Sequence, residues 1–207
     1  PIVALTDRST VGFEALSRFP PEMGAPERVF ELAAQVGLAE DLELAVLREA
    51  ISRFDLSEPG PYLSINVSPC TILGQRLERL LDEAPRDRIV IELTEHAKVN
   101  DYEQLVQRTD ALRQQGVRIA VDDAGAGYAS FRHVLLVRPD IIKLDRSLIG
   151  GIDTSPEKRL MAKSLTDYAA AMRAVIVAEG IERDEELDVL RHLSVPMGQG
   201  YLLGRPQ

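Results

Sequence analysis

The stretch PIVALTDRSTVGFEAL, residues 1–16, decides the fold. It contains two apolar, strand-like runs, PIVAL and VGFEAL, and only TDRST (Thr6–Thr10) separates them. A connection between parallel strands needs about a dozen residues or more. The two runs are therefore predicted to pair as antiparallel neighbours.

Six further β-rich runs follow, separated by segments with helical spacing. These runs are YLSINVS from Tyr62, RIVIELTE from Arg88, RIAVDD from Arg118, DIIKLD from Asp140, AVIVAEG from Ala174 and GQGYLLG from Gly198. N-cap signals precede two of the helical segments: Asn100 or Asp101 before one, and Ser155 followed by Pro156 before another. Strands that alternate with helices indicate an α/β fold, and eight strands close a (β/α)8 TIM-type barrel with an antiparallel first strand.

Composition narrows the class of protein. The 207 residues are 45% hydrophobic, which suits a single domain over residues 1–207, and the opening on PIVAL suggests a piece of a longer multidomain protein. A net charge of -9 argues against binding to duplex nucleic acid. No apolar run reaches the roughly 20 residues that span a bilayer, so no membrane segment is predicted in this chain. Cys70 is the single cysteine, which excludes an internal disulfide and favours a reducing compartment, the cytoplasm.

Polar side chains lie near the carboxyl end of the predicted strands. They are Glu14, Asn66, Glu92, Asp122, Asp123, Lys143, Asp145 and Glu179, with Gln199 at the start of the last run. In a parallel barrel these ends share one rim, where active sites are built. Since Glu14 belongs on that rim, the reversed strand is predicted to be the first, Ile2 to Leu5. Carboxylates at such density repel one another unless cations join them, and hard oxygen ligands suit Mg²⁺ or Mn²⁺ better than zinc.

Two adjacent aspartates, Asp122 and Asp123, end the run IAVDDAG. At the rim the strand passes into a turn, so the two side chains need not point to opposite faces. Each can then serve a different metal ion, and two ions about 3.5–4 Å apart are the usual clamp for phosphodiester hydrolysis. An equally weighted alternative makes Asp123 a helix N-cap, with Gly125 and Gly127 forming a tight turn.

Lys143 has three interpretations. A lysine at the end of a barrel strand can form a Schiff base, which requires a lowered pKa. Surrounding carboxylates would instead keep it charged, which suits orienting a water or screening a phosphate. The third interpretation is a structural ion pair with Asp145 or Glu179.

The assembled motifs resemble the EAL domain, the phosphodiesterase module that acts on cyclic di-GMP. The matching segments occur in the family's order and cover almost the whole chain: EALSR at Glu14, NVSP at Asn66, ELTE at Glu92, DDAGAG at Asp122, IKLD at Ile142, AEGIE at Ala178 and QGYLLGRP at Gln199. One departure is Ala124, where the family commonly has phenylalanine.

The resemblance implies roles for individual residues. One Mg²⁺ or Mn²⁺ would be held by Glu14, Asn66, Glu92 and Asp122, and a second by Asp123 beside Asp122. Glu179 would be the general base or a water-mediated ligand, and Lys143 would position the attacking water. Catalysis would thus rest on Glu14, Lys143 and Glu179. Substrate would contact Leu16, Arg18 and Gln199, and Gln199 would also support the hydrated metal site. Supporting roles fall to Glu95, which would anchor the loop after Asp123, and to Asp145 and Glu182.

The implied reaction converts cyclic di-GMP to linear pGpG by in-line attack of a metal-activated water. A homodimer through the loop and helix after Asp123 and regulatory domains in the full-length protein are expected from the family. A cyclic di-GMP receptor without turnover is the main alternative, motivated by Ala124. An aldolase-like or enolase-like barrel that uses Lys143 is a third hypothesis, weakened by the surrounding acids.

Overall fold

Eight strands close into one barrel, and they follow one another around it in sequence order. The computed structural model describes residues 1–54, 60–93, 99, 101–124 and 128–206. The strands are β1 (Ile2–Ala4), β2 (Thr10–Ala15), β3 (Tyr62–Val67), β4 (Ile89–Leu93), β5 (Arg118–Ala124), β6 (Ile141–Leu144), β7 (Val175–Ala178) and β8 (Met197–Gly198). The (β/α)8 barrel predicted from the sequence is confirmed.

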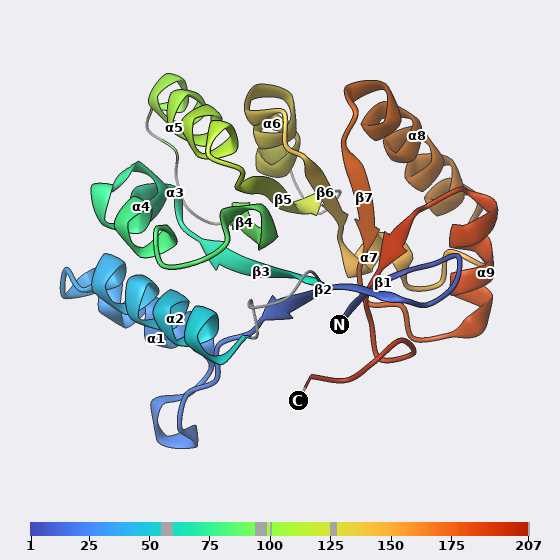
Figure 1. Ribbon diagram of the computed structural model, residues 1–207. Coiled ribbons are helices and arrows are strands. Elements are labelled where there is room, and N and C mark those ends of the chain that lie inside the picture. Colours follow the sequence, from blue (N-terminus) through green and yellow to red (C-terminus); the bar gives the residue numbers. More distant parts are fainter. Residues whose placement is uncertain (55–59, 94–98, 100, 125–127, 207) are drawn as a thin grey trace.

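Helices surround the strands on the outside of the barrel (Figure 1). They are α1 (Pro26–Gln35), α2 (Ala39–Arg53), α3 (Pro69–Leu73), α4 (Gln75–Leu81), α5 (Tyr102–Gln114), α6 (Tyr128–Val137), α7 (Arg146–Ile149), α8 (Pro156–Met172) and α9 (Asp184–His192), with short 3-10 turns at Pro21–Met23 and Arg86–Arg88. In the described ranges, every helix falls short of the length and apolar character that a bilayer crossing requires.

The first strand is reversed, as the short TDRST connection predicted. β1 pairs antiparallel with both β2 and β8, whereas the other neighbouring strands pair in parallel. The turn between β1 and β2 closes through Ala4 N, which donates to Ser9 O at 2.9 Å. Asp7 Oδ1 accepts from Ser9 N at 2.9 Å and stabilises this turn locally.

Alternation along each strand separates two layers of core. Ile89 and Ile91 of β4 belong to the large cluster that the strands share with the helices, whereas Val90 belongs to a second cluster. That second cluster consists of Ile2, Tyr62, Val90, Ala120, Ile141 and Val177. Residues two apart on a strand share a face. Several strands therefore carry a polar side chain two residues after their member of this second cluster, nearer to the carboxyl rim of the barrel.

Helix ends follow the predicted caps. Asp101 accepts from Gln104 N at the start of α5, and Ser155 accepts from Lys158 N at the start of α8. Gly116 follows α5 with φ 97°, a left-handed conformation that glycine adopts without steric cost. These caps fix the helices that connect successive strands.

The last predicted strand is shorter than the run GQGYLLG suggested. β8 ends at Gly198, so Gln199 follows this strand instead of opening it. A Cβ atom at Gly200 would lie 2.2 Å from both the nitrogen and the oxygen of Ile181, so only glycine fits there. Leu203 N and Gly204 N both donate to Gly200 O, and they turn the chain away from the barrel.

Candidate active site

Carboxylates on β2, β4 and β5, and one that directly follows β7, converge on the ammonium group of Lys143 at the carboxyl end of the barrel. Lys143 Nζ lies 2.7 Å from Glu92 Oε2 and 2.7 Å from Glu179 Oε1. It also lies 3.3 Å from Asp122 Oδ1 and 3.4 Å from Glu14 Oε2. The lysine side chain is only 2% exposed. The structure therefore brings these predicted rim residues together around one buried cation.

Amide and hydroxyl groups orient the carboxylates. Gln199 Nε2 donates to Glu14 Oε2 at 2.7 Å and to Glu179 Oε1 at 2.9 Å. Asn66 Nδ2 donates to the other oxygen of Glu14 at 3.2 Å. Ser64 Oγ donates to Glu92 Oε1, whereas Lys143 donates to the other oxygen of that carboxylate, Oε2. These hydrogen bonds fix the orientation of the Glu14, Glu92 and Glu179 carboxylates before any ligand binds.

The adjacent aspartates both face the site because β5 is irregular where they lie. The register of β5 against β6 shifts between Val121 and Ala124, and Asp123 has a positive φ of 54°. Carboxylate oxygens of Asp122, Asp123 and Glu179 consequently lie within 4.8 Å of one another. Asp123 lies within β5 and α6 begins at Tyr128, and the tight turn predicted at Gly125 and Gly127 between them lies outside the described residues.

Burial and charge shift the ionisation of the site. Burial raises the pKa of Glu92 to about 7 and the pKa of Glu179 to about 8, although the nearby Lys143 ammonium opposes both shifts. Burial alone would lower the pKa of Lys143, but the four carboxylates outweigh it and hold this pKa well above 10.5. A lysine that stays protonated is a poor Schiff-base nucleophile, so the site does not favour the aldolase-like hypothesis.

The donor set fits a hard divalent cation. In the described part of the chain, the group of potential ligands at the rim, Asp122, Asp123 and Glu179, consists of carboxylates. One lysine charge faces four acidic groups within 3.4 Å, which leaves an excess of negative charge in a buried place. Oxygen ligands of this kind are those that Mg²⁺ and Mn²⁺ prefer in proteins.

Two cavities flank the cluster at the mouth of the barrel. The larger, of about 600 Å³, is lined by Arg18 and Asn66 on one side and by α1 and α2 on the other. The smaller, of about 230 Å³, is lined by Glu14, Gln199 and Tyr201. Leu16 lines both cavities, so they meet at this side chain.

Comparison with known families identifies the chain. A family model described as "EAL domain" matches residues 1–206. The chain belongs to the EAL domain family. The resemblance inferred from the ordered motifs is confirmed.

Individual relatives of this EAL domain agree with the family. It is 32% identical over 207 residues to the "Probable cyclic di-GMP phosphodiesterase PdeA" of Escherichia coli, which covers 94% of the chain and 28% of that protein. The solved structure of the "EAL Enzyme Bd1971", with cAMP and cyclic di-GMP bound, matches with a TM-score of 0.87 and 26% identity over 100% of this chain and 60% of that one. A manganese and cyclic di-GMP complex of Klebsiella pneumoniae BlrP1 matches with a TM-score of 0.84 and 28% identity over 97% and 53% of the two chains. The chain spans about a quarter to two fifths of the length of the curated relatives it matches.

The remaining predicted residues of the EAL domain lie around this cluster or outside it. Arg18 lines the larger cavity, where its guanidinium donates to the carbonyl of Ser17. Asp145 caps α7 by accepting from Ser147 N. Of the two ion-pair partners predicted for Lys143, Asp145 and Glu179, the structure shows Glu179. Glu95 lies outside the described residues.

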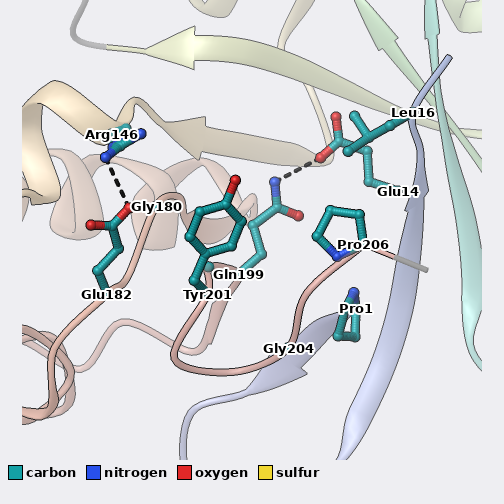
Figure 2. Close-up of a pocket in the computed structure, with 11 residues that line it drawn as sticks. Pro1, Glu14, Leu16, Arg146, Gly180, Glu182, Gln199, Tyr201, Gly204 and Pro206 are labelled. Atoms are coloured by element: carbon teal, nitrogen blue, oxygen red, sulfur yellow. Dashed lines mark hydrogen bonds and ion pairs between the residues drawn. The ribbon is translucent and has the colours of Figure 1, made fainter. Parts of the chain in front are cut away.

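Three side chains near the site were not predicted from the sequence alone. Ser64 binds Glu92, and its position two residues before Asn66 was the available signal, because both then face the barrel interior. Arg146 and Tyr201 line the smaller cavity, and Arg146 pairs with the predicted supporting residue Glu182 at 2.8 Å (Figure 2). No spacing rule joins these segments.

Proposed function

We propose that this EAL domain hydrolyses one phosphodiester bond of cyclic di-GMP with two divalent cations and releases linear pGpG. The observation that carries the proposal is the convergence of four carboxylates on Lys143, with Asp123 beside them. The names of the relatives, which include cyclic di-GMP phosphodiesterases from several bacteria, support this substrate. Two cavities that meet beside the cluster suit a ligand with two nucleotide halves.

The proposed metal ligands fall into two overlapping groups. The first ion would be held by Glu14, Asn66, Glu92 and Asp122, and the second by Asp122 and Asp123. Ions bound there would polarise the scissile phosphate and increase the acidity of a bound water. Both Mg²⁺ and Mn²⁺ accept these donors.

The chain's own residues would then direct the proton and the substrate. Glu179 is the proposed base, and its raised pKa suits the acceptance of a proton near neutral pH. Within the described residues its contacts with Lys143 and Gln199 both use Oε1, so Oε2 is the oxygen that we assign to the proton. Lys143 would orient the attacking water, and Arg18 and Leu16 would bind the substrate on the side of the larger cavity.

Assembly is a further part of the proposal. Leu135 and Leu136 of α6 are 59% and 42% exposed, and this apolar surface supports a homodimer through the helix that follows Asp123. The greater length of the curated relatives supports regulatory domains elsewhere in the full-length protein, which we place in the cytoplasm.

The test is a hydrolysis assay with cyclic di-GMP and Mg²⁺ or Mn²⁺. We expect pGpG from the wild-type protein, no product with a chelator, and no product from Glu14→Ala. Glu49→Ala, which changes an exposed glutamate of α2, is the matched control and should retain full activity. Binding of cyclic di-GMP without metal-dependent product would favour the receptor. Product that survives both the chelator and Glu14→Ala would refute the assigned site.

A further inference from the structure

We propose that Ser64 is a positioning residue for the divalent cation and that it acts through Glu92. In this proposal the Ser64 hydroxyl holds one oxygen of the Glu92 carboxylate, so that the other oxygen faces the remaining carboxylates of the cluster. The inference rests on the proposed function, because it takes Glu92 as a metal ligand.

Ser64 lies on β3 between the second apolar cluster and the carboxylate cluster. Tyr62, Ser64 and Asn66 share one face of this strand, because residues two apart point to the same side. Tyr62 belongs to the second apolar cluster, and Asn66 donates to Glu14 at the rim. Ser64 is 1% exposed. A hydroxyl at such a buried position destabilises the fold unless it has a hydrogen-bond partner.

The partner of the Ser64 hydroxyl is a proposed metal ligand on the neighbouring strand. Ser64 Oγ lies 2.5 Å from Glu92 Oε1, to which it donates. In the parallel register of β3 and β4, Asn66 lies opposite Glu92 and Ser64 lies opposite Val90. Ser64 therefore contacts Glu92 from two residues further back along the strands, whereas the other carboxylates lie at the rim.

The two oxygens of Glu92 have different surroundings. Oε2 lies 2.7 Å from Lys143 Nζ, and the same ammonium lies within 3.4 Å of oxygens of Glu14 and Asp122. Oε2 is thus the oxygen on the side where the other proposed ligands converge. A contact at Oε2 alone would leave the carboxylate free to rotate, since the terminal torsion of glutamate is broad. The contact of Ser64 with Oε1 fixes the plane of the carboxylate.

Glu14, another proposed ligand of the same ion, is also held at both oxygens. Its Oε1 accepts from Asn66 at 3.2 Å, and its Oε2 accepts from Gln199 at 2.7 Å. Hydrogen bonds that orient metal ligands in this way are worth about 10- to 100-fold in metal affinity or activity. Ser64 supplies the corresponding contact for Glu92.

A purely structural role for Ser64 is the alternative. Glu92 is 1% exposed, like Ser64, and a buried carboxylate needs hydrogen-bond donors whether or not it binds a metal. This role predicts that loss of the hydroxyl lowers the stability of the metal-free protein and leaves its metal affinity unchanged. Metal affinity therefore separates the two roles.

The test measures the binding of Mn²⁺ without substrate, from the electron paramagnetic resonance signal of free Mn²⁺ at fixed pH. Ser64→Ala should raise the dissociation constant of one bound ion at least about tenfold. Ser64→Cys nearly preserves the volume but has a weak donor, so it should lose a similar part of the affinity. Thr166→Ala, which removes a buried hydroxyl of α8, is the matched control and should bind Mn²⁺ like the wild type.

A double-mutant cycle determines whether Ser64 acts through Glu92. Glu92→Gln should weaken the same ion, because it removes the charge of the proposed ligand. Ser64→Ala should cause no further loss in that background, since the effects of residues that act through one another are not additive.

The opposite results overturn the inference. Wild-type affinity for Mn²⁺ in Ser64→Ala or Ser64→Cys would show a structural role and would leave the proposed function intact. The full loss in the Glu92→Gln background would show that Ser64 does not act through Glu92. A wild-type protein that binds no Mn²⁺ would defeat the proposed metal site and this inference with it. Thermal unfolding with a chelator verifies that each variant is folded, and Ser64→Cys decides the question if Ser64→Ala is not.

Discussion

Replacement of Lys143 by methionine removes the central cation of the mouth while it nearly preserves side-chain volume. In the metal-free protein this leaves Glu92 and Glu179 without the ammonium that lies 2.7 Å from each of them. Removal of one partner from a buried ion pair costs about 3–5 kcal/mol. For a domain of this size that loss corresponds to a decrease of about 6–20 °C in the unfolding midpoint.

The assay is thermal unfolding followed by circular dichroism, at pH 7 and with a chelator present. We expect the midpoint of Lys143→Met to fall as stated, and Mn²⁺ to raise it by more than it raises the wild-type midpoint, because bound cations replace the missing charge. Lys163→Met is the matched control. Its lysine pairs with Asp167 on the exposed face of α8, so its midpoint should change little.

Two results would refute this reasoning. If metal-free Lys143→Met were as stable as the wild type, the Lys143 ammonium would not be the group that stabilises the buried carboxylates in the folded protein. If Mn²⁺ stabilised the variant and the wild type equally, the carboxylates around Lys143 would not be the groups that bind the ions.

Two further predictions concern the metal-free wild type. The pKa values of Glu92 and Glu179 rise on folding from 4.5 to about 7 and about 8, so their contribution to stability is complete below pH 4.5 and is lost as pH rises toward 8. Urea denaturation across this range should show a falling free energy of unfolding, and a rising one would contradict the shifts. Among the described residues the buried Tyr62 hydroxyl has no hydrogen-bond partner, so Tyr62→Phe should raise the free energy of unfolding by about 1 kcal/mol. A loss of stability in the same assay would show that the hydroxyl has a partner after all.

Local rules predicted the architecture and most of the rim. The five residues Thr6–Thr10 cannot cross to a parallel strand, and this length limit, together with the place of Glu14 on the rim, predicted the direction of β1. The carboxyl ends of parallel strands share one rim, and this rule placed Asn66, Glu92 and Lys143 at one end of the barrel. Both rules depend on chain geometry, so one sequence is enough to apply them.

Contacts between distant segments set the limit of that prediction. The run GQGYLLG has the composition of a strand, yet the approach of Gly200 to Ile181 turns it away after Gly198. Asp145 has the spacing of an ion-pair partner for Lys143, but its carboxylate caps α7 instead. Arg146 reaches the mouth only because it crosses Gly180. Packing between distant segments decides where β8 ends, what Asp145 binds and where Arg146 lies, and no local sequence pattern encodes these contacts.

The reversed strand has a mechanical consequence for the barrel. β1 is only three residues long, yet it pairs with both β2 and β8 and thereby closes the barrel. Because it runs against its neighbours, Pro1 stands at the mouth, where it packs on Gly204 and forms part of the wall of the smaller cavity. The residue that begins this strand is therefore itself part of the cavity wall, so a change of side chain at Pro1 changes the shape of the cavity.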